Sequence, residues 1–163
     1  MIEIETIQKA SPHGHCIFCE DIRQEVNGKE IFVGVFPGSE MFVFGSLPTN
    51  IGKFAIKVFY AQLPSDPLVP MTIEVMMPGD DEASAKIELD LAKASEAFPP
   101  PPDDGDGDDV FMGLQFTFVF NPLEIKKEGV IRVRAVREGK SFKLGSLSVK
   151  PHPVEPQQEE AAN

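Results

Sequence analysis

Apolar side chains recur at every second residue over most of this chain. The clearest run is Phe54, Ile56, Val58 and Tyr60. A spacing of two residues places such side chains on one face of an extended strand, whereas a helix requires a spacing of three or four. Comparable apolar runs occupy 14–25, 30–36, 41–44, 71–77, 85–91, 114–120, 131–135 and 142–149. The pattern therefore predicts an all-β chain of about eight or nine strands.

Strands with one apolar face have to cover that face. Two antiparallel sheets packed face to face achieve this, because their apolar faces meet in one interior. We therefore predict a two-layer antiparallel β-sandwich, immunoglobulin-like in kind. Segment 83–97 departs from the pattern, since its Ala, Lys and Glu content also suits a helix, at least from Leu91 onward.

Two local signals add detail to the strands. The dipeptide Asn27-Gly28 predicts a two-residue hairpin turn, because both residue types tolerate a positive φ. Such a turn would pair Glu20 with Val35 and carry Glu20 toward the interior. In the last strand the apolar phase slips by one residue near Gly145, which indicates a β-bulge.

The length of 163 residues suits a single domain with one core. A proline run followed by an acidic run fills 98–109, and residues 151–163 are mostly polar. Neither segment holds enough apolar residues to offset the entropy lost on ordering. We expect one sandwich domain over 1–150, a disordered Pro/Asp-rich loop at 98–109 and a disordered tail at 151–163.

The chain is acidic, with a net charge of −11. Phosphate backbones and anionic lipid surfaces would repel it, so we expect no nucleic-acid or membrane partner. No apolar stretch is long enough to span a bilayer, and residues 1–5 do not open a signal peptide. The expected compartment is the cytoplasm.

Positive charge is concentrated near the C-terminal end of the domain. Residues 124–150 hold eight basic side chains and three acidic ones, whereas 79–109 carries a charge of −9. Arg132 and Arg134 alternate with apolar residues, so they should lie on the exposed side of their strand. They are candidate contacts for a protein partner.

Glu20, Asp21 and Arg23 form an unusual polar group within an apolar strand. One interpretation is a small polar pocket or recognition patch, which could also serve an enzyme. The other places Glu20 at the rim of the sandwich, with Asp21 and Arg23 as a surface ion pair. No nucleophile, base or cofactor motif accompanies them, so we assign no catalytic residue and expect no cofactor.

Two segments have metal-ligand residue types. His13, His15, Cys16 and Cys19 could suggest zinc, but a strand sends the two thiols to opposite faces and no second Cys pair completes a site. We expect free thiols. Asp104-x-Asp106-x-Asp108 resembles the start of a calcium loop, yet positions six and twelve, Asp109 and Gln115, depart from it. We assign no metal ligand.

The sequences at 19–25, 27–29 and 34–36 (Cys-Glu-Asp-Ile-Arg-Gln-Glu, Asn-Gly-Lys and Gly-Val-Phe) resemble a known opening hairpin. It belongs to an uncharacterised bacterial family of small all-β, immunoglobulin-like sandwich domains. Residues 129–133, 138–140 and 147–149 are similar to that family's closing hairpin. The resemblance implies a β-sandwich over roughly the whole domain and implies nothing about catalysis.

These observations leave the biological role open among three classes. The first is a non-enzymatic protein-binding or scaffold module, for which Ile17, Cys19, Phe32 and Phe36 form an apolar patch that would also suit a homodimer. The second is a metal-binding module using zinc or calcium. The third is an enzyme that works from the polar group at Glu20.

Overall fold

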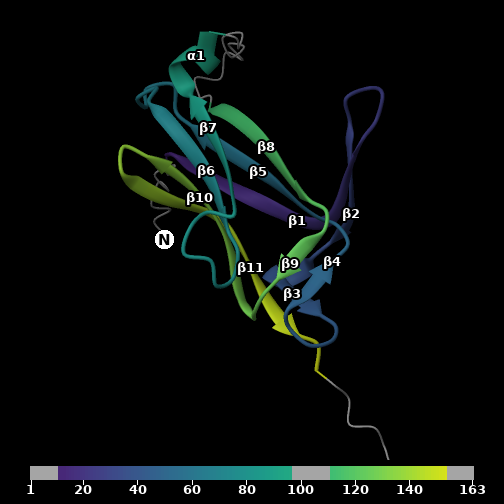
Figure 1. Ribbon diagram of the computed structural model, residues 1–163. Helices are drawn as coiled ribbons and strands as arrows, with labels where there is room; N and C mark the ends of the chain where they lie inside the picture. The colour runs from purple at the N-terminus through teal and green to yellow at the C-terminus, as the bar shows by residue number, and fades with distance from the viewer. Residues whose placement is uncertain (1–10, 97–110, 154–163) are drawn as a thin grey trace, which may run out of the picture.

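The computed structural model describes residues 11–96 and 111–153 (Figure 1). The predicted loop at 98–109 therefore lies outside the described residues. Alternating apolar residues form eleven strands within the described part of the chain. They are β1 (His13–Gln24), β2 (Glu30–Val35), β3 (Glu40–Val43), β4 (Thr49–Ile51), β5 (Phe54–Gln62), β6 (Pro70–Met76), β7 (Ala85–Asp90), β8 (Met112–Phe120), β9 (Leu123–Ile125), β10 (Gly129–Arg137) and β11 (Lys140–Pro151). A 3-10 turn spans Pro37–Ser39, and a short helix, α1, spans Leu91–Glu96.

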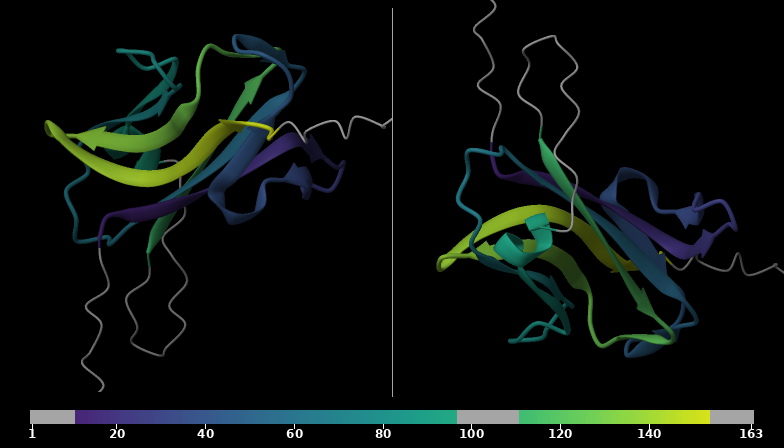
Figure 2. Two further views of the ribbon diagram at one scale, coloured as in Figure 1. Left: turned by 90° about the horizontal axis from the view of Figure 1, so that it is seen from below. Right: turned by 90° about the horizontal axis from the view of Figure 1, so that it is seen from above.

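The strands form two main sheets that lie face to face (Figure 2). One sheet has the order β2-β1-β5-β8 and the other the order β3-β11-β10-β6-β7. All described pairings are antiparallel except that of β3 with β11, which is parallel. The predicted all-β sandwich is confirmed, and its immunoglobulin-like character stays a prediction.

The interior consists mainly of apolar side chains. Ile56 from one sheet and Ile73 and Val133 from the other have no solvent-exposed surface, and Phe116 packs against the same cluster partly buried. At about 25 cal/mol for each Å² of apolar surface, such burial is the main force that holds the two sheets together.

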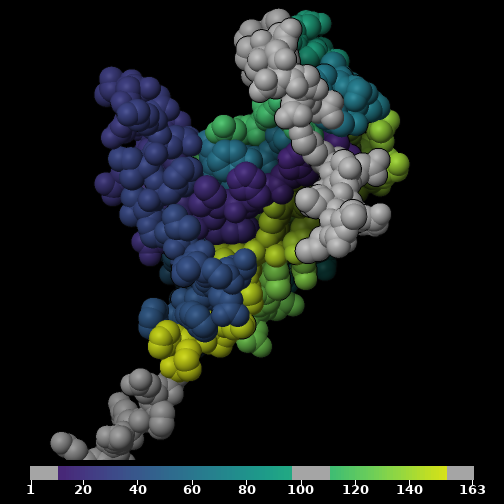
Figure 3. Space-filling view, turned by 180° about the vertical axis from the view of Figure 1, so that it is seen from behind, coloured from purple at the N-terminus to yellow at the C-terminus, as the bar shows by residue number. Residues whose placement is uncertain are grey.

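Strand β5 is covered on both faces, although its sequence predicts only one apolar face. Ala55 and Lys57, which point away from the interior, are also buried. The Lys57 ammonium donates a hydrogen bond of 2.7 Å to Glu30 at the start of β2. The hairpin of β1 and β2 therefore reaches back to β5, and Figure 3 shows it standing out as an arm.

The register of this hairpin differs from the prediction by one residue. Cys19 pairs with Val35 and Gln24 with Glu30, whereas a two-residue turn would pair Glu20 with Val35. The loop is longer than expected because the backbone N–H of Glu25 donates a hydrogen bond to the carbonyl of Lys29, which leaves three residues between them. Gly28, at φ 79°, adopts the left-handed conformation. A three-residue loop of this kind is the alternative turn that an Asn-Gly pair supports.

Other local predictions are confirmed. The β10–β11 register shifts between Val133 and Arg134, opposite Gly145 on β11, where the apolar phase slips in the sequence. The helix at Leu91 is the one that the composition of 83–97 favours. The strand count is higher than predicted because β4 and β9 form a separate three-residue pairing, too short to show alternation.

The end of the domain also differs from the expectation. Strand β11 continues through Pro151, and the backbone N–H of His152 donates a hydrogen bond of 2.8 Å to the carbonyl of Val43. The sandwich therefore extends past residue 150, because β3 offers a pairing edge there. The remainder of the predicted tail, 154–163, lies outside the described residues.

Arg137 is a second buried charge besides Lys57, with 5 % of its surface exposed. Its guanidinium donates hydrogen bonds to Tyr60 and Gln62, both at 2.8 Å, and to the backbone carbonyl of Pro67 at 2.7 Å. These contacts tie β10 to β5 and to the loop that leads into β6. A buried charge is tolerated only when its donors are satisfied in this way.

We therefore expect Arg137→Ala to lower the free energy of unfolding by about 2–4 kcal/mol, because it removes these charged hydrogen bonds and leaves their acceptors buried. Urea unfolding followed by circular dichroism measures the change. The exposed Lys140→Ala is the control, with an expected change within about 0.5 kcal/mol. Equal losses in both variants would contradict this role for Arg137.

Candidate functional site

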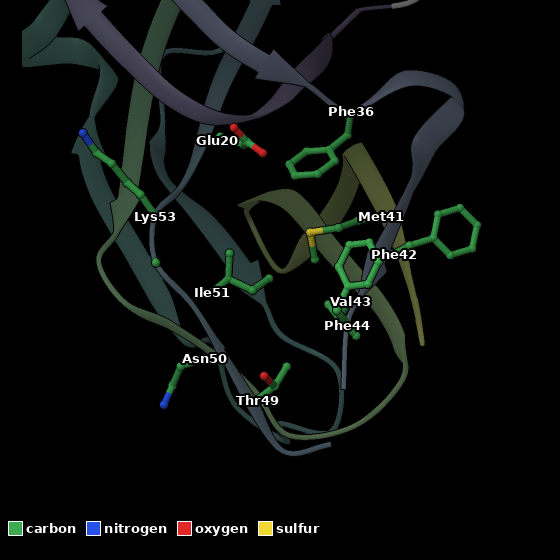
Figure 4. Close-up of a pocket in the computed structure, with 11 residues that line it drawn as sticks. Glu20, Phe36, Met41, Phe42, Val43, Phe44, Thr49, Asn50, Ile51 and Lys53 are labelled. Carbon is green, nitrogen blue, oxygen red and sulfur yellow. The ribbon is translucent and has the colours of Figure 1, made fainter. Parts of the chain in front are cut away.

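A pocket of about 440 Å³ opens beside strand β3 (Figure 4). Its wall comes from β3 and the residue after it, from β4 and the turn that follows, and from two residues near the β1–β2 hairpin. The lining residues are Glu20, Phe36, Met41, Phe42, Val43, Phe44, Thr49, Asn50, Ile51, Gly52 and Lys53. The centre is apolar, and the polar groups stand at the rim.

Both sides of strand β3 border this pocket. Met41 and Val43 point inward and are 2 % and 3 % exposed, whereas Phe42 and Phe44 point outward and are 46 % and 74 % exposed. Among the described strands, β3 has β11 as its single neighbour and stands at the end of its sheet. The pocket therefore opens onto a free strand edge.

His152 joins the two outward phenylalanines in an aromatic cluster. Its ring stacks on Phe44 with centroids 4.5 Å apart and meets Phe42 edge-on at 6.1 Å. Figure 3 shows the blue surface of this region beside the yellow end of β11. The sequence shows the apolar run Met41-Phe-Val-Phe44. It does not show which alternate pair of these side chains faces the core, so the exposure of Phe42 and Phe44 could not be predicted from it.

Glu20 lies at the rim of the pocket, not in the interior (Figure 4). This agrees with the interpretation that places Glu20 at the rim of the sandwich. The inward direction that a two-residue turn would give is wrong, because the actual register places Glu20 across from Gly34. A Cβ atom on Gly34 would lie 2.6 Å from the Glu20 carboxyl carbon, and Gly34 has a φ of 62°. Glycine therefore makes room for the Glu20 side chain over β2.

Asp21 and Arg23 form the predicted ion pair, 3.3 Å apart, and Lys53 adds a closer contact of 2.5 Å to Asp21. The hydrogen bond from Lys53 is the main reason that the pKa of Asp21 lies below its ordinary value of 3.8. Lys53 turns its ammonium away from the hollow in Figure 4. Of the predicted polar group, Glu20 alone lines the pocket.

Arg132 and Arg134 lie on the outer face of the other sheet. Arg134 donates a hydrogen bond of 2.8 Å to Glu74, and Arg132 is exposed. The structure therefore separates these two arginines from Glu20, and the five predicted site residues do not form one site.

The predicted apolar patch is largely covered. Cys19 has no exposed surface, and Ile17, Phe32 and Phe36 are partly buried. Phe36 packs against Phe54 with ring centroids 5.9 Å apart. The four side chains therefore do not form an exposed apolar patch, because Phe36 packs against the core and Cys19 is fully buried.

Cys16 and Cys19 are free thiols, and burial raises the pKa of Cys16 to about 12. Burial also raises the pKa of Cys19. His15 stacks on Phe59 at 4.5 Å. Within 11–96 and 111–153 no group of three or more His, Cys, Asp or Glu side chains is placed to hold a metal ion. Asp104, Asp106 and Asp108 lie outside the described residues.

Four polar residues line the pocket: Glu20, Thr49, Asn50 and Lys53. The Lys53 ammonium points away from the hollow, which leaves a carboxylate, a hydroxyl and an amide at the rim. A catalytic hydroxyl requires a base within hydrogen-bond reach, and no such contact joins Thr49 to Glu20 in the described part of the chain. An apolar centre with polar rim groups is the usual form of a recognition surface.

Comparisons with protein-family models, with curated proteins and with solved structures found no match for this chain. The resemblance to a bacterial all-β family therefore stays a prediction. Helices long and apolar enough to cross a membrane do not occur among the described residues.

The Asp21 contacts predict a pH effect. A carboxyl group whose pKa is lower in the folded protein stabilises the fold above its unfolded pKa, and this contribution is lost as the pH falls through the folded pKa. We expect Asp21→Asn to unfold at lower urea concentration than wild type at neutral pH, with a gap that closes below about pH 4. Asp81→Asn, at an exposed position, is the control, and a gap that does not change with pH would contradict the assignment.

The two cysteines should be inert in the folded protein. Disulfide exchange requires the thiolate, and a pKa of about 12 keeps Cys16 protonated at pH values where the fold is stable. Reaction with a chromogenic disulfide at mildly alkaline pH should release almost no product until urea is added, and then two equivalents. Fast release from the native protein would show that burial does not protect these thiols.

Proposed function

We propose that this domain is a non-enzymatic protein-binding module that takes an extended segment of a partner along the free edge of β3. The observation that carries the proposal is the pair Phe42 and Phe44, 46 % and 74 % exposed, on a strand with an unpaired side. Free edges pair readily with another extended chain.

Proteins usually protect such edges with lysine, proline or a covering loop. The edge strand here places two aromatic rings outward, and its single flanking charge, Glu40, is in an ion pair with Lys150. The adjoining pocket of about 440 Å³ has room for an apolar side chain of the bound segment. Backbone hydrogen bonds would supply affinity, and this pocket would supply specificity.

The reducing cytoplasm is part of the same proposal. Two free thiols, one fully buried and one partly buried, support it, because an oxidising compartment favours paired cysteines. The resemblance to the bacterial all-β family is compatible with a binding role and supplies no activity.

The test is selection of peptides from a random display library on the immobilised wild-type protein. Selected peptides should bind Phe42→Ser/Phe44→Ser at least about tenfold more weakly, since aromatic anchors dominate such interfaces. The variant should stay folded, which circular dichroism checks, with a loss of about 1–3 kcal/mol in the free energy of unfolding from the two ring contacts with His152.

The matched control is Val26→Ser/Val119→Ser, which removes exposed apolar side chains elsewhere on the surface. It should bind the peptides as wild type does. Amide shifts in NMR spectra should concentrate in 40–44 and 49–53. If the selected peptides bind the Phe42→Ser/Phe44→Ser variant as tightly as wild type, this binding site is refuted.

A further inference from the structure

Strand register places a row of charged side chains across the outer face of the five-stranded sheet, whose strands β7, β6, β10 and β11 lie side by side in Figure 1. Lys86 on β7 pairs in register with Glu74 on β6, and Glu74 pairs with Arg134 on β10. Arg134 in turn pairs with Lys143 on β11. Side chains paired in this way lie on the same face, so the row reads positive, negative, positive, positive.

The β-bulge in β11 creates the last step of this row. Val133 pairs with Gly145, and the next residue along β10, Arg134, pairs with Lys143, so Leu144 is the extra residue. An unbroken register would place apolar Leu144 opposite Arg134. The bulge therefore sets two like charges side by side, an arrangement that destabilises a sheet.

The carboxylates on this face do not neutralise all of its positive charge. Glu74 lies 2.8 Å from Arg134, and Glu88 lies 2.8 Å from Lys86. Arg132 and Lys143 have no carboxylate within ion-pair distance among residues 11–96 and 111–153. A chain of net charge −11 thus leaves two cations unpaired on one small surface.

These cations border a hollow of about 530 Å³. Its lining consists of Val130, Arg132, Val133, Arg134, Ser141, Lys143 and Ser146. None of these residues lines the pocket beside β3. The hollow therefore offers two guanidinium groups, one ammonium and two hydroxyls as hydrogen-bond donors.

We propose that this hollow, the cationic trench, binds a carboxylate-rich peptide segment of a partner protein. Guanidinium groups hold carboxylates through paired hydrogen bonds, and the unpaired Arg132 and Lys143 supply the attraction. Nucleic acid fits less well, because the strongly negative chain repels a long phosphate polymer more than a short acidic segment. The trench is a second surface, independent of the β3 edge.

The experiment is fluorescence anisotropy with a labelled hexa-aspartate peptide and the full chain at about 50 mM salt, where screening is modest. The peptide should bind wild type, and Arg132→Gln/Lys143→Gln should weaken binding at least about tenfold. Lys29→Gln/Lys93→Gln, which removes the same charge from exposed positions on the first hairpin and on α1, should bind as wild type does.

Absence of binding to wild type would overturn the proposal, and so would an equal loss in the control variant. Circular dichroism confirms that each variant is folded, and the single change Arg132→Gln should give an intermediate loss. The variant Phe42→Ser/Phe44→Ser should bind hexa-aspartate normally. Failure of the trench and failure of the β3 edge are therefore distinguishable.

Discussion

The contact between the two sheets is the constraint on which the rest of this structure depends. Ile56, Ile73 and Val133 lose all solvent exposure there, and each comes from the middle of a strand. Because the central strands of both sheets contribute alternate residues to this interior, the direction of their remaining side chains is fixed. Surface features of the domain are therefore consequences of how its core is filled.

Packing the two sheets together buries their inner faces, but the backbone N–H and C=O groups at the strand edges remain unpaired. The arm formed by β1 and β2 bends back so that Glu30 reaches Lys57, which covers part of the outer face of β5. Strand β3 has no such cover among the described residues, and its outward side chains are aromatic. Our proposal places recognition at this edge, because an uncovered edge already presents backbone donors and acceptors.

The positions of the charged side chains on the two sheets also follow from the arrangement of the strands. Asp21 and Arg134 sit in ion pairs on different sheets. Strand register fixes the pair of Arg134 with Glu74, whereas Asp21 and Arg23 are two residues apart on the same strand. Neighbouring cations at Arg132 and Lys143 lie outside this balance, because a one-residue bulge brings Lys143 next to Arg134. A sandwich can carry such a local excess of charge without loss of its fold, since the energy of the core lies in apolar burial.

The sequence by itself predicted the longer strands, the sandwich and the bulge near Gly145, and it left a helix from Leu91 as one of two options. Each of these depends on residues close together in the chain, and periodicity and turn chemistry are local properties. It missed β4 and β9, which are too short to show alternation. It could not decide the register of the first hairpin, because an Asn-Gly pair supports both two-residue and three-residue loops. The direction of Glu20 depends on that one-residue choice. The β3 pocket and the cationic trench join residues far apart in the chain, so only the tertiary structure, through pairing and packing across the two sheets, decided where they lie.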